Sequence, residues 1–224
     1  MALVSCLFVL LAILALSLQS QGNEDGPSHR LNLLIEENRG ALISSTQDLI
    51  KIKSIRGGPG PGAPFGQGPA DALDRALDTA RSMGFNVTNM DGYIGYAEYG
   101  QGDDYVAVLS HMDTVPEGGG WTYPPYGAEI HDGKIFGRGA TDDKGPSMAA
   151  LYGLMAVRDS GLNLSKKVRI IFGTTEETGR EDIEYYLERE KVPASGFTPD
   201  GEYPVILAEK GFLDLKLARG LMMR

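Results

Sequence analysis

Cysteine is almost absent from this chain, which has only Cys6 among its 224 residues. A single thiol excludes a fold that is held together by internal disulfides. Positive charge is also scarce, because 21 Lys and Arg face 30 Asp and Glu and leave a net charge of −9 at pH 7. Such a chain offers little to the phosphates of a nucleic acid, so we expect no nucleic-acid partner.

Extreme composition is absent as well. Apolar residues make up 42% of the chain and charged residues 23%, which are ordinary values for a globular protein. Intrinsic disorder and fibrous repeats are therefore excluded. The length allows one large domain, or one domain with part of another.

One long apolar run stands at the N-terminus. Residues 2–18 contain no charged side chain, and the first basic residue of the chain is Arg30. The run resembles the apolar core of a signal peptide and is followed by small residues suited to cleavage, although basic residues before it are missing. We expect residues 1–22 to be a signal peptide and the protein to be secreted or extracytoplasmic, with an uncleaved N-terminal membrane anchor as the alternative.

The rest of the chain alternates helical and strand patterns. Apolar residues at helical spacing predict helices over about 29–52, 69–84, 146–158 and 180–191. Aromatic or continuous apolar runs predict strands at 93–99, 105–109 and 168–172, with a short edge strand at 135–136. This alternation predicts an α/β fold with a mostly parallel sheet layered between helices.

Metal-ligating residue types follow the two central strands. The first central strand runs into His111 and Asp113, and the second runs into Glu176 and Glu177. Sites in open α/β sheets form beyond the carboxyl ends of the strands. We therefore expect these four side chains at one edge of the sheet.

Further carboxylates lie between and after these strands. Asp142 and Asp143 precede a predicted helix, and Asp200 follows the second strand further along. Each has an ordinary alternative explanation, because acidic residues often cap a helix or face water. One imidazole and several carboxylates at a single sheet edge, however, suit zinc or another divalent ion. No arrangement of Ser or Cys nucleophiles competes with this interpretation.

Four strings occur in a definite order. They are Ser-His-Met-Asp-Thr-Val-Pro at 110–116, Gly-Arg-Gly-Ala-Thr-Asp-Asp-Lys-Gly-Pro at 137–146, Thr-Glu-Glu-Thr-Gly at 175–179 and Thr-Pro-Asp at 198–200. Together they resemble the dinuclear-zinc exopeptidases, the family of carnosinases, aminoacylases, succinyl-diaminopimelate desuccinylase and PepV-type dipeptidases. The strings Asp-Asp-Lys-Gly-Pro and Phe-Thr-Pro-Asp look most like the PepV-type dipeptidases. The resemblance covers residues 29–217.

The resemblance implies a metal-ligand set. It implies one zinc held by His111, Asp142 and Asp200, and a second zinc that shares Asp142 and also binds Glu177. It also implies a cis peptide bond between Asp142 and Asp143. A shared ion shell requires His111 and Asp142 to lie within about 6 Å, because zinc–ligand bonds are about 2 Å long.

The resemblance also implies catalytic roles for two carboxylates. Asp113 would orient the imidazole of His111, and Glu176 would be the general base. Zinc lowers the pKa of a bound water towards about 7, so Glu176 could take its proton and pass it to the leaving amine. The predicted function is metal-dependent hydrolysis of the amide bond of a small, dipeptide-like substrate. The alternatives are an N-acyl-amino-acid deacylase or desuccinylase, and a non-catalytic secreted zinc-binding domain.

The sequence departs from the family's pattern in its histidines. The family supplies a further metal-ligating histidine far downstream, whereas the histidines here are His29, His111 and His131, and none follows Asp200. His131 lies in a turn signal, so we expect it at the surface. We therefore expect one zinc, on His111, Asp142 and Asp200, to bind better than two.

The sequence also stops about where the family's lid domain begins. We divide it into the leader at 1–22, the N-terminal portion of a zinc peptidase catalytic domain at 23–211, and the start of a truncated lid domain at 212–224. The lid helps to bind substrate and often dimerises in the family. Its truncation puts the activity of this chain in question, and a homodimer is expected only with a lid present.

Overall fold

The computed structural model describes residues 26–201 together with residues 206, 208 and 211. The predicted leader at 1–22 and the predicted lid segment at 212–224 lie outside the described residues. Among the helices of the described part, none combines the length and the apolar character needed to cross a membrane.

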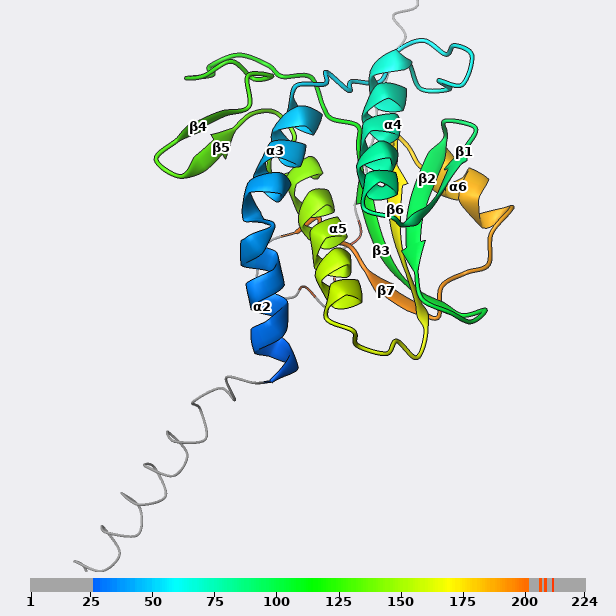
Figure 1. Ribbon diagram of the computed structural model, residues 1–224. Coiled ribbons are helices and arrows are strands. Elements are labelled where there is room, and N and C mark those ends of the chain that lie inside the picture. The colour runs from blue at the N-terminus through cyan, green and yellow to red at the C-terminus, as the bar shows by residue number, and fades with distance from the viewer. Residues whose placement is uncertain (1–25, 202–205, 207, 209–210, 212–224) are drawn as a thin grey trace, which may run out of the picture.

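A five-stranded sheet forms the centre of the fold (Figure 1), with the strand order β1-β2-β6-β3-β7. Its strands are β1 Asn86–Met90, β2 Ile94–Tyr99, β3 Tyr105–His111, β6 Lys167–Gly173 and β7 Ser195–Phe197. β2 pairs antiparallel with β1 and β6, whereas β3 pairs parallel with β6 and β7. β2 is therefore the reversed strand of a sheet whose other strands share one direction, which confirms the predicted mostly parallel α/β architecture.

Helices cover both faces of this sheet. They are α2 Pro27–Glu37, α3 Arg39–Ile50, α4 Gln67–Ser82, α5 Lys144–Asp159 and α6 Glu181–Leu187. α3, α4 and α5 pack on one face and share a buried apolar cluster with β2, β3 and β6 (Figure 1). α6 contributes Tyr186 to a second buried cluster on the opposite face. A separate hairpin consists of β4 Glu129–His131 and β5 Lys134–Phe136.

The central strands are apolar at successive positions because both of their faces are covered. In β6, Ile170 and Phe172 join the cluster under α3, α4 and α5, whereas Ile171 joins the cluster under α6. Alternate residues of a strand point to opposite faces of its sheet. The continuous apolar run in the sequence therefore reflects a two-sided core.

Two of the predicted helices differ from the observed ones. The single helix predicted over 29–52 is wrong, because Asn38 (φ −99°, ψ 3°) separates α2 from α3. The Asn38 side chain donates to the carbonyl of Leu34 at 2.8 Å, and Asn and Gly are weak helix formers. The helix predicted over 180–191 is shorter, because it ends at Leu187 and closes with a tight turn from the Arg189 amide to the Tyr186 carbonyl.

The sequence patterns do not predict β1 and β7, the two edge strands. β1 is polar because it lies at the edge, and it joins β2 through residues 91–93, of which Asp91 and Gly92 have φ values of 55° and 75°. The Asp-Gly pair is the usual signal for such a hairpin turn and would have revealed β1. β7 has only three residues, all exposed, and carries no comparable pattern.

Candidate metal centre

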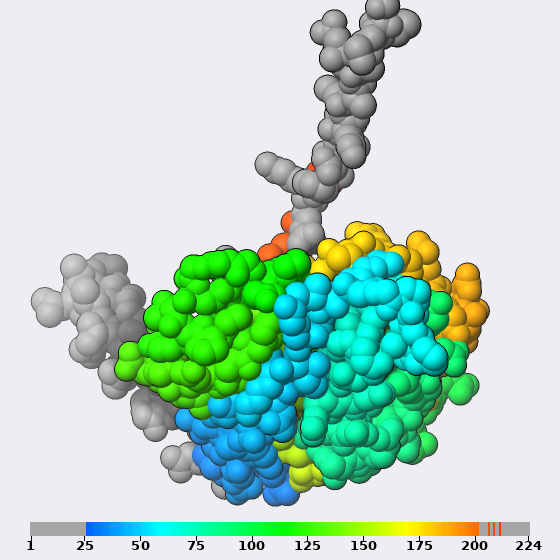
Figure 2. Space-filling model, turned by 90° about the horizontal axis from the view of Figure 1, so that it is seen from above, coloured from blue at the N-terminus to red at the C-terminus, as the bar shows by residue number. Residues whose placement is uncertain are grey.

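The candidate site lies at the carboxyl ends of β3 and β6. His111, the last residue of β3, is in register with Gly173, the last residue of β6. Parallel pairing brings the segments that follow these strands to the same edge of the sheet. Seen from above, the loops that follow β3 are green on one side, and the segments that follow β6 are yellow and orange on the other (Figure 2).

The imidazole of His111 is at the centre of the site and is only 2% exposed. Its Nε2 atom lies 3.0 Å from Oδ1 of Asp142 and 3.5 Å from Oδ2 of Asp200. The distance to Asp142 is well within the 6 Å that a shared ion shell allows. The side chains of Asp142 and Asp200 are 52% and 32% exposed, so this side of the imidazole is open to an ion from solvent.

Glu176 also reaches this site. One ligand atom from each of His111, Glu176 and Asp200 lies within 4.8 Å of the other two, and this is the only group of three imidazole, thiol or carboxylate ligands in the described residues. The imidazole nitrogen and the carboxylate oxygens are donors that zinc accepts. The residues present therefore fit a divalent ion, and the general base that the sequence predicts lies beside the predicted ligands.

Asp113 contacts both the imidazole that ends β3 and the turn that follows β6. Its main-chain carbonyl oxygen lies 3.1 Å from Nδ1 of His111, and its carboxylate is fully buried and lies 3.4 Å from the same atom. The same carboxylate accepts hydrogen bonds at 3.1 Å from the backbone N–H groups of both Glu176 and Glu177. The sequence predicts only that Asp113 orients the imidazole. Its hydrogen bonds to the amides of Glu176 and Glu177 could not be predicted from any motif.

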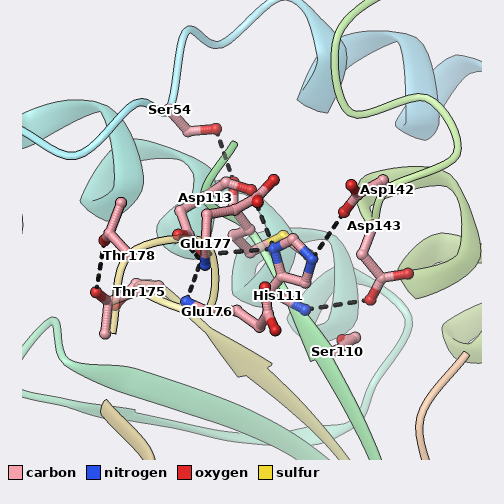
Figure 3. A network of polar contacts seen from close by, with 12 residues as sticks. Ser54, Ser110, His111, Asp113, Asp142, Asp143, Thr175, Glu176, Glu177 and Thr178 are labelled. Atoms are coloured by element: carbon pink, nitrogen blue, oxygen red, sulfur yellow. Dashed lines mark hydrogen bonds and ion pairs between the residues drawn. The ribbon is translucent and has the colours of Figure 1, made fainter. Parts of the chain in front are cut away.

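Asp142 and Asp143 lie on one side of the imidazole (Figure 3) and are joined by a cis peptide bond. The carboxylate of Asp143 is buried, and its Oδ2 atom accepts the backbone N–H of His111 at 3.2 Å. Its Oδ1 atom has no hydrogen-bond partner among the described residues. Burial raises the pKa of Asp143 to about 7, although His111 opposes the shift.

Glu177 lies on the other side of the imidazole from Asp142 (Figure 3). Its Oε1 atom accepts the backbone N–H of Val115 at 3.2 Å. Burial and then the charge of Asp142 raise the pKa of Glu177. Among the described residues, neither Asp142 nor Glu177 belongs to a group of three ligand atoms that lie within 4.8 Å of one another.

The site has a strong negative potential. Burial lowers the pKa of His111, but its hydrogen bond to Asp113 and the charges of the surrounding carboxylates outweigh burial and raise it to about 10. Burial and neighbouring carboxylates also raise the pKa of Glu176. Without a cation the carboxylates hold a proton on the imidazole, and a metal ion would take the place of that proton.

Lys144 supports the site, and sequence analysis missed this role. The side chain is completely buried and donates to the carbonyls of Leu49 and Ile52, at 3.0 and 2.7 Å. Burial lowers the pKa of Lys144 to about 7, and the charge of Asp113 opposes this shift. The sequence does contain a signal for this role: Lys144 lies two residues before a helix that is predicted to be buried, and a buried lysine requires specific partners.

His131 stays outside the site, as its turn-like sequence predicts. It ends β4, where its Nε2 atom lies 2.8 Å from Glu129 and its ring stacks on Tyr123 with centroids 3.7 Å apart. Its side chain is 36% exposed.

Comparison with known proteins agrees with this geometry. The sequence profile of Peptidase family M20/M25/M40 matches residues 107–218, which include every predicted ligand. The chain belongs to this family. The M20/M25/M40 match begins within β3 and includes both sides of the candidate metal centre.

Two relatives in sequence are dipeptidases by name. The putative dipeptidase YtjP of Bacillus subtilis (strain 168) is 47% identical over 178 residues, which are 79% of this chain and 38% of the relative. The Beta-Ala-Xaa dipeptidase of Lactobacillus delbrueckii subsp. lactis is 39% identical over 188 residues, 83% of this chain and 40% of the relative. The chain thus spans about two fifths of the length of these M20/M25/M40 relatives.

A solved structure shows the same fold. Human carnosine dipeptidase 1 superposes with a TM-score of 0.65 and 23% sequence identity, and the match covers 78% of this chain and 41% of the human protein. The α/β arrangement described above is therefore that of the corresponding portion of a known peptidase structure.

Proposed function

We propose that this chain carries the N-terminal part of the catalytic domain of a metal-dependent dipeptidase. The observation that carries the proposal is the convergence of Asp142, Asp200 and Glu176 on the buried imidazole of His111. The family membership and the dipeptidase relatives agree with this activity. The substrate would be a small dipeptide-like molecule.

His111, Asp142 and Asp200 would hold the first ion, with zinc as the metal that best suits one imidazole and two carboxylates. When bound, the ion would supply Lewis-acid activation of water and of the scissile carbonyl. Asp113 would keep the imidazole in the ligating orientation, because its main-chain carbonyl oxygen lies 3.1 Å and its carboxylate 3.4 Å from Nδ1. We propose that a second ion binds more weakly, because no group of three ligand atoms in the described residues includes Glu177.

Glu176 would transfer a proton from the attacking water to the leaving amine. Its carboxylate would accept a proton from water while the water oxygen forms a bond to the carbonyl carbon. The same carboxyl group would then protonate the amide nitrogen, and the C–N bond would break to release the amine. Burial already raises the pKa of Glu176, which favours a group that both takes and gives a proton.

The variant Glu176→Gln tests this assignment. We expect it to abolish hydrolysis of a β-alanyl dipeptide by the purified chain while the zinc content, measured by mass spectrometry, stays unchanged. Glu188→Gln is the matched control, because the side chain of Glu188 is 71% exposed and its carboxylate pairs with Arg189. Unchanged turnover in Glu176→Gln would refute the role of this residue.

The other activities are outcomes of the same assay. Hydrolysis of an N-acetylated amino acid in preference to the dipeptide would identify a deacylase. Zinc retained by an unsubstituted chain that hydrolyses neither substrate would favour a zinc-binding domain without catalysis.

We also propose that the protein is exported. The support is the uncharged run at residues 2–18, and the test is expression in a secreting host. Removal of about the first 22 residues, seen in the mass of the secreted chain, is the expected result. A full-length chain in the membrane fraction would favour the anchor.

A further inference from the structure

We propose that Arg56 is a positioning residue for the turn that carries Glu176 and Glu177. This inference rests on the proposed function, because it assigns Arg56 to the same site. Arg56 lies in the coil after α3, 119 residues before the start of the turn at Thr175. It belongs to none of the strings that resemble the exopeptidases.

The guanidinium of Arg56 bonds to both ends of the turn. Its Nη1 atom donates to Oγ1 of Thr175 at 2.9 Å and to Oγ1 of Thr178 at 3.2 Å. Thr175 directly precedes Glu176, and Thr178 directly follows Glu177. The two hydroxyl oxygens are 3.1 Å apart (Figure 3), so one donor holds the ends of the turn together.

Carboxylates hold the backbone of the same turn from the other side. Asp113 accepts the N–H groups of Glu176 and Glu177, and Asp182 accepts those of Thr174 and Thr175. These acceptors fix the main chain but do not touch the threonine side chains. Arg56 adds the donor that links the side chains on either side of the glutamate pair.

The guanidinium is itself held in place. Its Nη2 atom donates to Oε1 of Glu181 at 2.7 Å, and its plane lies over the ring of Phe65 at 5.0 Å. Phe65 packs edge-on against Tyr93, with ring centroids 5.3 Å apart. The planar guanidinium donates to three acceptors and packs on an aromatic ring at the same time, whereas the ammonium of a lysine at this position would be a single point charge.

The fixed turn would lower the cost of binding an ion. The turn carries Glu177, the proposed ligand of the second ion, directly after the general base Glu176. Ordering a mobile side chain costs binding free energy, so a turn that is rigid before the ion arrives binds it more tightly. Loss of the Arg56 contacts would release both ends of the turn and thereby the two glutamates.

The test compares Arg56→Met with Arg189→Met in the full chain. Arg189 lies 3.5 Å over the ring of Tyr185, which stacks on Tyr93, and pairs with Glu188. Both variants thus remove a guanidinium from one stack of aromatic rings, but only Arg56 touches the turn. The first readout is hydrogen exchange of the Glu176 and Glu177 amides in the metal-free chain, followed by NMR.

We expect Arg56→Met to speed this exchange about tenfold or more, the effect of losing hydrogen bonds to a charged group. We expect its affinity for the second Co²⁺ ion, the one that Glu177 would bind, to fall about 10- to 100-fold, as for other groups that orient metal ligands. Arg189→Met should change neither quantity. Unchanged exchange and affinity in Arg56→Met, or equal changes in both variants, would overturn the proposal.

A second variant keeps the test decisive if Arg56→Met does not fold. The double variant Thr175→Val with Thr178→Val preserves the ion pair between Arg56 and Glu181 and removes the contacts of Arg56 to the turn, together with the hydrogen bond between the two hydroxyls. Faster exchange at the two glutamate amides would support the proposal, and unchanged exchange would contradict it. Neither readout requires turnover, so a failure of the proposed hydrolysis would leave the result on Arg56 intact.

Discussion

The buried ammonium group of Lys144 donates a hydrogen bond to the carbonyl of Leu49, at a distance of 3.0 Å. Leu49 lies in the last turn of α3, and Lys144 is the first residue of α5. A cation at the C-terminal end of a helix satisfies carbonyls that have no partner within the helix. This bond therefore fixes the start of α5, and with it Asp142 and Asp143, against the end of α3.

The variant Lys144→Met is expected to lower the free energy of unfolding by about 1–3 kcal/mol, because it leaves the Ile52 carbonyl without its donor and the Leu49 carbonyl with only the Ile52 N–H. Urea denaturation followed by circular dichroism measures the change. Lys51→Met is the control, since the Lys51 side chain is 54% exposed and its pairing with Asp48 spans 3.7 Å. Equal stabilities of the two variants would show that the buried lysine contributes nothing through its carbonyl contacts.

Asp113→Asn should weaken the binding of a divalent ion about 10- to 100-fold, because the residue orients groups on both sides of the site. An asparagine offers one acceptor oxygen where the carboxylate uses two, so one of the amides of Glu176 and Glu177 would face an N–H donor. Isothermal titration with Co²⁺ measures the affinity. Asp132→Asn, in an exposed turn with φ 49°, should bind as the unsubstituted chain does. Unaltered affinity in Asp113→Asn would contradict its predicted role.

Gly173→Ala should destabilise the chain, because a Cβ atom at this position would lie 2.6 Å from Oδ2 of Asp182. That oxygen accepts the N–H groups of Thr174 and Thr175, so the methyl group would displace an acceptor of the turn. We expect a loss of about 1–3 kcal/mol in the free energy of unfolding, as for other overpacked sites.

Gly153→Ala is the matched control for this substitution. Gly153 lies inside α5, and a Cβ atom there would meet nothing within 4 Å. Alanine is the better helix former, so we expect a gain of up to about 1 kcal/mol. Thermal unfolding of the two variants should therefore shift the midpoint in opposite directions, and a shift in the same direction would refute the steric argument.

Glu117 should remain ionised in acid to an unusual degree. The hydrogen bond from Lys53, at 2.7 Å, together with those from its own backbone N–H and from Tyr126, lowers the pKa of Glu117 from 4.5 to about 2. A carboxyl group with a lowered pKa stabilises the fold fully above its unfolded pKa. This contribution is lost as the pH falls from 4.5 through about 2.

NMR titration of the Glu117 carboxyl carbon checks this expectation. At pH 3.5 the group should still be ionised in the unsubstituted chain, whereas Lys53→Met should raise its pKa towards 4.5. Lys51→Met removes a comparable charge from the end of α3 without touching Glu117, so it should leave the titration unchanged. A midpoint near 4.5 in the unsubstituted chain would show that the Lys53 contact does not persist in solution.

The sequence predicts those elements whose own residues carry the pattern, and it does not predict those that depend on contacts with other segments. Three successive apolar residues, Ile170, Ile171 and Phe172, fill both faces of β6, and this pattern predicts the strand and its central place correctly. The edge strand β7 depends on pairing with β3 rather than on its own three residues, so its sequence does not reveal it. The break at Asn38 depends on one side-chain hydrogen bond, to Leu34, which competes with helix propensity.

The types and order of the site residues were determined by the amino-acid sequence, because each ligand belongs to a short string directly after a strand or before a helix. Their convergence was determined by tertiary packing: His111 and Asp142 are 31 residues apart in the chain and 3.0 Å apart in space. The roles of Lys144 and Arg56 likewise appear only in the folded chain. A sequence pattern records local periodicity, whereas the burial of a charge and the partners of a guanidinium depend on segments that only the fold brings together.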